Sequence, residues 1–97
     1  MSIARIGQFQ AKPETIHALR EFMLSIMPLI KDSAGCVSCE LFQSQADATQ
    51  FTMVEIWDSV EAHKASVKNI PPDKLREIAP LIAAPPSGNY FDTVAKR

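Results

Sequence analysis

Two side chains that could take part in chemistry lie in one apolar stretch of the chain, FTMVEIW. Glu55 stands in its middle, and a carboxylate removed from water needs a partner or takes up a proton. It is therefore either a polar group that lines a cavity or a structural acceptor for a donor on a neighbouring strand, such as Arg5. Trp57 follows two residues later, so it falls on the same strand face, where it either fills the core or touches a ligand.

A histidine is the side chain best suited to move protons near neutral pH. His63 shares a helical stripe with Val67 and Ile70, which predicts that it faces the sheet. A core histidine and a histidine that transfers protons or binds substrate both fit this position. Ser66 and Asn69 follow at spacings of three, and they predict a short polar edge along the same helix.

The pair Cys36 and Cys39 forms a CxxC motif, which raises the question of a redox or metal site. Side chains alternate faces along a strand, so we expect these two thiols to point to opposite sides of the sheet. A structural zinc ion also needs four ligands, and the sequence has no second CxxC and no HxxxH. We therefore predict no metal site, and the lack of a glycine-rich loop predicts no phosphate or dinucleotide cofactor.

The composition limits the class of protein. The 97 residues suit a single domain, 1–97, with one core, and the net charge of -1 gives no positive field to attract nucleic acid. No apolar run approaches the roughly 20 residues of a membrane span. The N-terminal residues lack the basic and then apolar pattern of a signal peptide, so we expect a cytoplasmic protein with no membrane partner.

The elements that must position these residues follow from periodicity and from helix signals. Prolines and Ser59 indicate two helices, one from Pro13 and one that ends at residues 71–72, and Pro28 predicts a bend or interruption in the first. A short helical segment follows at 73–84. Alternating apolar residues predict four strands, at 3–10, 36–44, 50–58 and 89–95.

This order, β-α-β-β-α-β, is the split βαβ pattern of ferredoxin-like α+β folds. Crossovers are right-handed, so both helices are expected on one face of a four-stranded antiparallel sheet. The strand at 50–58 is apolar on both faces, and the chain has no further elements to cover the second face. We therefore predict a homodimer whose open sheet faces pack against each other.

Residues 35–66, GCVSCELFQSQADATQFTMVEIWDSVEAHKAS, resemble the signature of the antibiotic biosynthesis (quinol) monooxygenase family. A Gly-Cys turn leads into a strand, an aromatic-led strand ends in Glu-x-Trp, and a helix opens with Ser-x-Glu-Ala. The resemblance implies a dimeric α+β barrel with a pocket between sheet and helices in each subunit. It also implies oxidation of a small quinol or phenol by O₂ with no metal or flavin cofactor, because the substrate supplies the electrons.

On this hypothesis His63 and Trp57 are the catalytic residues, and segment 71–86 covers the pocket as a static cover or a lid. The family's usual helical histidine corresponds to Ser66 here, which favours an alternative: a small-metabolite binding or regulatory domain, or a cofactorless isomerase, on the same fold. The residues expected to bind substrate are Phe42, Glu55, Ser66, Asn69 and Phe91.

Overall fold

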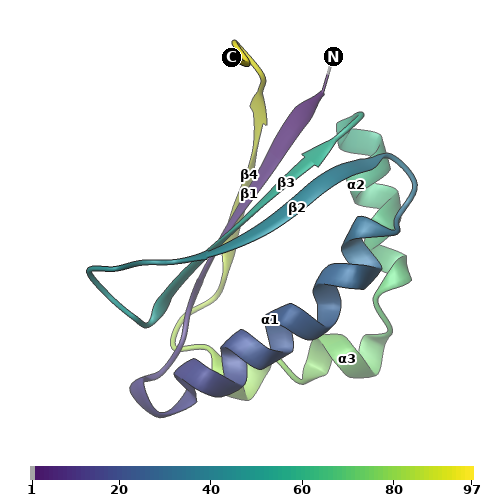
Figure 1. The fold of residues 1–97 in the computed structure, drawn as a ribbon. Helices are drawn as coiled ribbons and strands as arrows, with labels where there is room; N and C mark the ends of the chain where they lie inside the picture. Colours follow the sequence, from purple (N-terminus) through teal and green to yellow (C-terminus); the bar gives the residue numbers. More distant parts are fainter. Residues whose placement is uncertain (1) are drawn as a thin grey trace.

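The computed structural model describes residues 2–97, which form one four-stranded antiparallel sheet in the order β2-β3-β1-β4. β1 therefore pairs with both β3 and β4 at the centre of the sheet (Figure 1). The predicted strands are confirmed, except that the last one begins and ends earlier than its sequence suggested. The strands are β1 (Ile3–Gln10), β2 (Cys36–Gln43), β3 (Gln50–Trp57) and β4 (Ser87–Asp92).

The helices lie on one side of the sheet, as the handedness of the crossovers predicted (Figure 1). A 3₁₀ turn at Pro13–Thr15 leads into the long helix α1 (Ile16–Lys31). The second crossover is broken into short pieces by its prolines: α2 (Val60–Ser66), a 3₁₀ turn at Val67–Asn69, α3 (Pro72–Arg76) and a 3₁₀ turn at Ala79–Leu81. No helix within residues 2–97 has the length and apolar character that crossing a bilayer requires.

The predicted interruption at Pro28 does not occur, because α1 runs through this residue to Lys31. Proline removes one backbone N–H, and the carbonyl four residues earlier, that of Leu24, loses its helical donor. Both residues are on the exposed side of the helix, where water can satisfy that carbonyl. The buried stripe of α1 is left intact and consists of Leu19, Phe22, Met23, Ile26 and Ile30.

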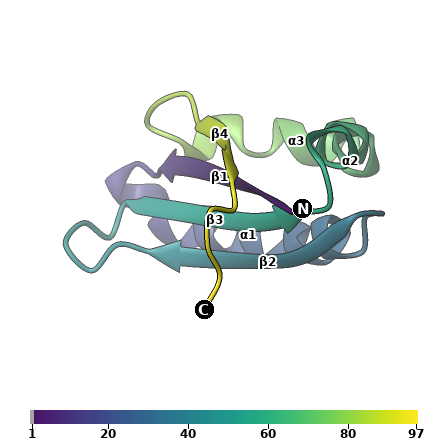
Figure 2. The same cartoon turned by 90° about the horizontal axis from the view of Figure 1, so that it is seen from above.

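The strand β3 alternates strictly between buried and half-buried residues. Phe51, Met53, Glu55 and Trp57 point toward the helices and form the floor of the core. Val54 and Ile56 point to the other face, which no helix or strand within residues 2–97 covers, although the segment after β4 crosses it near Ile56 (Figure 2). That open face also carries Val37, Phe42 and Phe91, each about half exposed.

The expectation that the two thiols point to opposite faces is wrong. A register irregularity between Cys36 and Ser38 adds one residue to β2, so Cys36 pairs with Trp57 and Cys39 with Glu55 on the helix-covered side. Both cysteines are free and pack against the core. Burial raises the pKa of the Cys39 thiol to about 12, which keeps it protonated at neutral pH.

Candidate functional site

A cavity of about 320 Å³ lies between the sheet and the helices. The strand register gives it a polar end and an apolar end: Arg5 pairs with Glu55, and the next pairs along the same face are Gly7 with Met53 and Phe9 with Phe51. His63 from α2 joins the polar end. The apolar lining comprises Phe9, Phe22, Met23, Ile26, Ile30, Met53, Ile70, Leu75, Ile78 and Pro86.

Two glycines make the space for this cavity at the sheet. Gly7 and Gly88 are paired across β1 and β4 and point to the helix side, where side chains would fill the space. Arg5 uses part of this room, since a Cβ atom at position 88 would lie only 2.3 Å from its Nη2. Glycine at position 88 therefore lets the guanidinium lie flat against β4 beside the cavity.

Glu55 lines the cavity and is also tied to its own strand. Its Oε1 accepts a hydrogen bond of 2.9 Å from the Trp57 indole N–H, and both side chains are buried. Burial raises the pKa of this carboxyl, while the indole hydrogen bond and the charge of Arg5 offset part of that effect. The two roles considered for Glu55 are therefore compatible, although its structural partner is Trp57 instead of Arg5.

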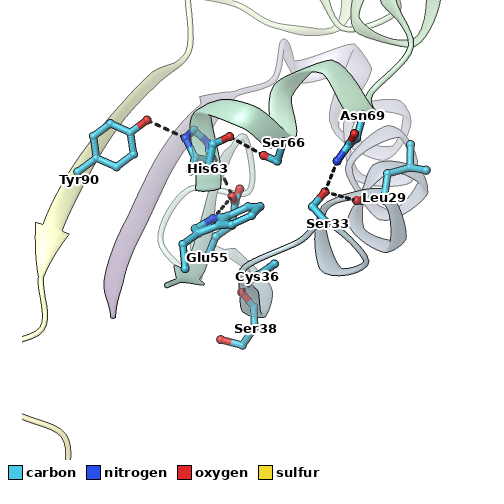
Figure 3. Close-up of polar contacts among 10 residues, drawn as sticks. Leu29, Ser33, Cys36, Ser38, Glu55, His63, Ser66, Asn69 and Tyr90 are labelled. Atoms are coloured by element: carbon cyan, nitrogen blue, oxygen red, sulfur yellow. Dashed lines mark hydrogen bonds and ion pairs between the residues drawn. The ribbon is translucent and has the colours of Figure 1, made fainter. Parts of the chain in front are cut away.

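His63 stands between Glu55 and Tyr90 (Figure 3). Its Nε2 is 4.0 Å from Glu55 Oε1, and its Nδ1 is 2.7 Å from the Tyr90 hydroxyl. Burial lowers the pKa of His63, and Arg5 lowers it further, so the imidazole is neutral at neutral pH. A tyrosine hydroxyl can donate to Nδ1 or accept from it, so this contact is compatible with a proton on either ring nitrogen.

Local features place His63 above the sheet. Ser59 caps α2 by accepting the Ala62 N–H, and the Asp58 N–H donates to the Gly35 carbonyl at the entry to the helix. Gly35 has φ +88°, and a Cβ atom there would meet Ala62 Cβ at 2.6 Å. The first turn of α2 therefore packs directly on the backbone before β2, which fixes the position of His63 one residue later.

Segment 71–86 covers the cavity from the side of α3. Leu75, Ile78 and Pro86 contribute to the lining. The later part of the segment is held to the start of the chain, because Thr15 Oγ1 donates to the Leu81 carbonyl and the Ala83 N–H donates to the Gln10 carbonyl. These two hydrogen bonds anchor the segment near its C-terminal end.

Several residues expected at the site lie elsewhere. Ser66 donates to the His63 carbonyl, and Asn69 donates to Ser33 Oγ near the end of α1, so the predicted polar edge does not face the cavity (Figure 3). Phe42 and Phe91 are on the open face of the sheet, because their partners there are Thr52 and Ala4. Trp57 is fully buried and contacts the site through Glu55 and an edge-to-face contact with His63.

Sequence reasoning missed Tyr90, Gly7 and Gly88. Tyr90 is the only tyrosine in the chain, but its strand is joined to His63 only through the fold. Arg5 had been considered only as a partner for Glu55, whereas its guanidinium lies 4.8 Å from the centre of the Tyr90 ring. Among the side chains of residues 2–97, no group of three His, Cys, Asp or Glu is arranged to hold a metal ion.

The strand order and the one-sided helices define a ferredoxin-like α+β fold, here with a cavity between the two layers. The model of the family "Antibiotic biosynthesis monooxygenase" matches residues 2–78, and the chain belongs to this family. The resemblance seen in residues 35–66 is thereby confirmed.

Solved structures agree on the fold. Rv0793 from Mycobacterium tuberculosis superposes with a TM-score of 0.85 at 18% identity, over 99% of this chain and 98% of that one. PA3566 from Pseudomonas aeruginosa gives 0.83 at 21% identity, over 97% and 95%. A protein from Chloroflexus aurantiacus J-10-fl, whose name gives the same family, gives 0.76 at 29% identity, over 100% and 97%. None of the curated proteins matches the chain.

Proposed function

We propose that this protein is a cofactor-independent monooxygenase of the cytoplasm that oxidises a small quinol or phenol with O₂ in the cavity. The observation that carries the proposal is the division of the cavity: apolar walls from the sheet, α1, α3 and the segments beside α3, and a polar end formed by Arg5, Glu55 and His63. Membership of the monooxygenase family supports it. Such a cavity suits an aromatic ring with one polar substituent.

The chemistry begins with removal of the hydroxyl proton, because a phenolate gives electrons to O₂ more readily than a phenol. A neutral His63 accepts this proton at Nε2 while its Nδ1–H donates to the Tyr90 oxygen. The overall reaction balances without a cofactor: a phenol and O₂ give a quinone and water, and each product receives one atom of the O₂. Glu55 beside Nε2 stabilises the imidazolium that forms.

Oxygen consumption tests this function. Wild-type protein incubated with a panel of hydroquinones and phenols is expected to consume O₂ above the blank, and His63→Gln should lower kcat about 100-fold, as expected for loss of a proton acceptor. Burial and Arg5 lower the pKa of His63. On acidification, kcat/KM should therefore decline only at a pH below the ordinary pKa range of histidine. His17→Gln is the matched control, because His17 is exposed on α1 and does not line the cavity. Oxygen traces at the blank level across the panel, or equal rates for the two variants, would contradict the proposal.

A second candidate is a small-metabolite binding domain or a cofactorless isomerase on the same fold. The observation that favours it is Ser66, at the position of the family's usual helical histidine, whose hydroxyl bonds to its own helix. A ligand would then raise the melting temperature by mass action while oxygen consumption stays at the blank. Thermal shift measured beside O₂ uptake on the same panel separates the two functions.

We also propose that the protein is a homodimer joined through the open face of the sheet. The half-exposed Val37, Phe42 and Phe91 lie on this face together with Val54 and Ile56. Exposed apolar side chains gathered on one face are typical of a protein interface. Phe42 and Phe91, first expected to bind substrate, then contribute to subunit contacts.

A further inference from the structure

Arg5 is a cation beside an otherwise apolar cavity with no anionic partner among the described residues. The register places it directly opposite Glu55 on the same face of the sheet, yet its guanidinium forms no ion pair within 4.0 Å. It lies instead toward β4, over the Tyr90 ring at 4.8 Å and in the space that a side chain at Gly88 would occupy. Its side chain is only half-buried, so its N–H donors remain available to a molecule in the cavity.

Two features of β4 hold the guanidinium in this position. The Tyr90 ring supports it by a cation–π contact while the Tyr90 hydroxyl binds His63 Nδ1. Gly88 leaves the room that a Cβ atom would take from Nη2. The same strand therefore contacts both the charged donor and the proton acceptor at the polar end of the cavity.

We infer that Arg5 is the anchor for the substrate's anionic oxygen, and that the ligand is a flat aromatic ring carrying a phenolate, with its oxygen at the guanidinium and its ring in the apolar part of the cavity. This inference deepens the proposed function and rests on it for the aromatic ring. An arginine forms charge-assisted hydrogen bonds with an anionic oxygen, and these are stronger than its hydrogen bonds with a neutral one. The guanidinium lies over Gly88 and the edge of the Phe9 ring lies near Gly7, so these two side chains border the space left for the ring.

A phenol that loses its proton in the cavity leaves its negative charge beside Arg5. His63 is neutral at neutral pH, so it can take up that proton. Gly88 and Tyr90 are positioning residues in this scheme, because they act on the substrate through Arg5 and His63.

Binding of two matched ligands without oxygen tests the inference. Isothermal titration calorimetry at pH 8 under nitrogen would compare 4-nitrophenol, which is largely ionised there, with 4-nitroanisole, whose oxygen is methylated and carries no charge. Wild-type protein should bind the phenolate at least about tenfold more tightly than the anisole, since a hydrogen bond to a charged oxygen is stronger than one to a neutral oxygen. Arg5→Gln should bring the ratio of the two affinities, 4-nitrophenol over 4-nitroanisole, close to one and leave the affinity for 4-nitroanisole unchanged.

Two further variants separate a loss of anchoring from a loss of folding. Gly88→Ala should also lower the ratio, because its methyl group displaces the guanidinium. Arg20→Gln is the matched control, since Arg20 is exposed on α1 and does not line the cavity. Circular dichroism compares the folding of each variant with that of the wild type. If Arg5→Gln does not fold, Arg5→Lys replaces it; this variant keeps the charge and should retain part of the affinity ratio.

A wild-type ratio near one, a ratio that survives Arg5→Gln, or no binding of either ligand would overturn the inference. None of these measurements depends on turnover. A protein that prefers the phenolate through Arg5 but never consumes O₂ would contradict the monooxygenase function and leave the anchor in place. A protein that consumes O₂ but shows no preference for the phenolate would contradict the anchor and leave the monooxygenase function in place.

Discussion

Glu55 shows how one residue links stability to the chemistry of the site. Its carboxyl is buried at the polar end of the cavity, where the Trp57 indole is its hydrogen-bond donor. Burial raises the pKa of this carboxyl, so the folded protein holds a proton there at pH values where the unfolded chain is already ionised. Over that interval the free energy of unfolding falls as the pH rises.

Glu55→Gln should remove this pH dependence. Glutamine cannot ionise, but its carbonyl oxygen can still accept the Trp57 N–H. The stability of the variant relative to wild type should therefore increase as the pH rises from the ordinary glutamate pKa to the raised one. Urea denaturation across that pH range measures the difference.

The matched control for this experiment is Glu21→Gln, because Glu21 is exposed on α1. Its stability difference from wild type should stay nearly constant across the same interval. A stability difference for Glu55→Gln that is equally flat would show that ionisation of Glu55 has no cost in the folded protein.

At the scale of elements, the turn before β2 and the helix α2 form one unit. Gly35 adopts a positive φ, and the Asp58 N–H donates to its carbonyl. Ala62 lies directly over it, so no side chain fits between the turn and the helix. Since His63 follows Ala62, the geometry of the candidate site depends on this contact.

Gly35→Ala should destabilise the protein by about 2 to 5 kcal/mol. Positive φ costs about 1 to 2 kcal/mol for a residue with a Cβ atom, and crowding adds a further 1 to 3 kcal/mol. The added Cβ atom would lie 2.6 Å from Ala62 Cβ and would push α2 away from the sheet. Chemical denaturation measures the loss, and ligand affinity should fall with it because His63 moves.

The double variant Gly35→Ala with Ala62→Gly serves as the control, since it relieves the crowding and keeps the backbone strain. It should recover part of the lost stability, less the cost of a glycine within α2. Gly7→Ala, where φ is not positive and the added Cβ atom meets only the edge of the Phe9 ring at 3.2 Å, should cost less than Gly35→Ala. Equal losses at positions 7 and 35 would contradict this account of the turn.

At the scale of the whole molecule, one layer of helices covers one face of the sheet, and only the short C-terminal segment crosses the other (Figure 2). On the proposed dimer, the open faces of two copies pack together and bury Phe42. Phe42→Glu would place a charge in that interface, so it should convert dimer to monomer at micromolar concentration. Sedimentation equilibrium gives the mass of each species.

Leu24→Glu is the matched control for the dimer, because Leu24 is also a large exposed apolar residue but lies on α1, away from the open face. Its mass should equal that of the wild-type dimer. A wild-type protein of monomer mass at micromolar concentration would contradict the dimer, and dissociation by Leu24→Glu would place the interface elsewhere.

The sequence by itself determined the order of the elements, the alternation of β3 and the inward position of His63. Each of these depends on local periodicity: a period of two in strands and of 3.6 in helices, read within a window of a few residues. The segment around Glu55, Trp57 and the start of α2 also identified the family, because its residues lie close together in the chain.

Only the tertiary structure decided which residues meet at the polar end of the cavity. The extra residue between Cys36 and Ser38 reverses the face of one thiol, and periodicity cannot locate such an irregularity. Tyr90 reaches His63, and Gly88 makes room for Arg5, because β4 pairs with β1. These contacts join residues far apart in the sequence, and their geometry depends on strand register and helix packing, which no local pattern contains.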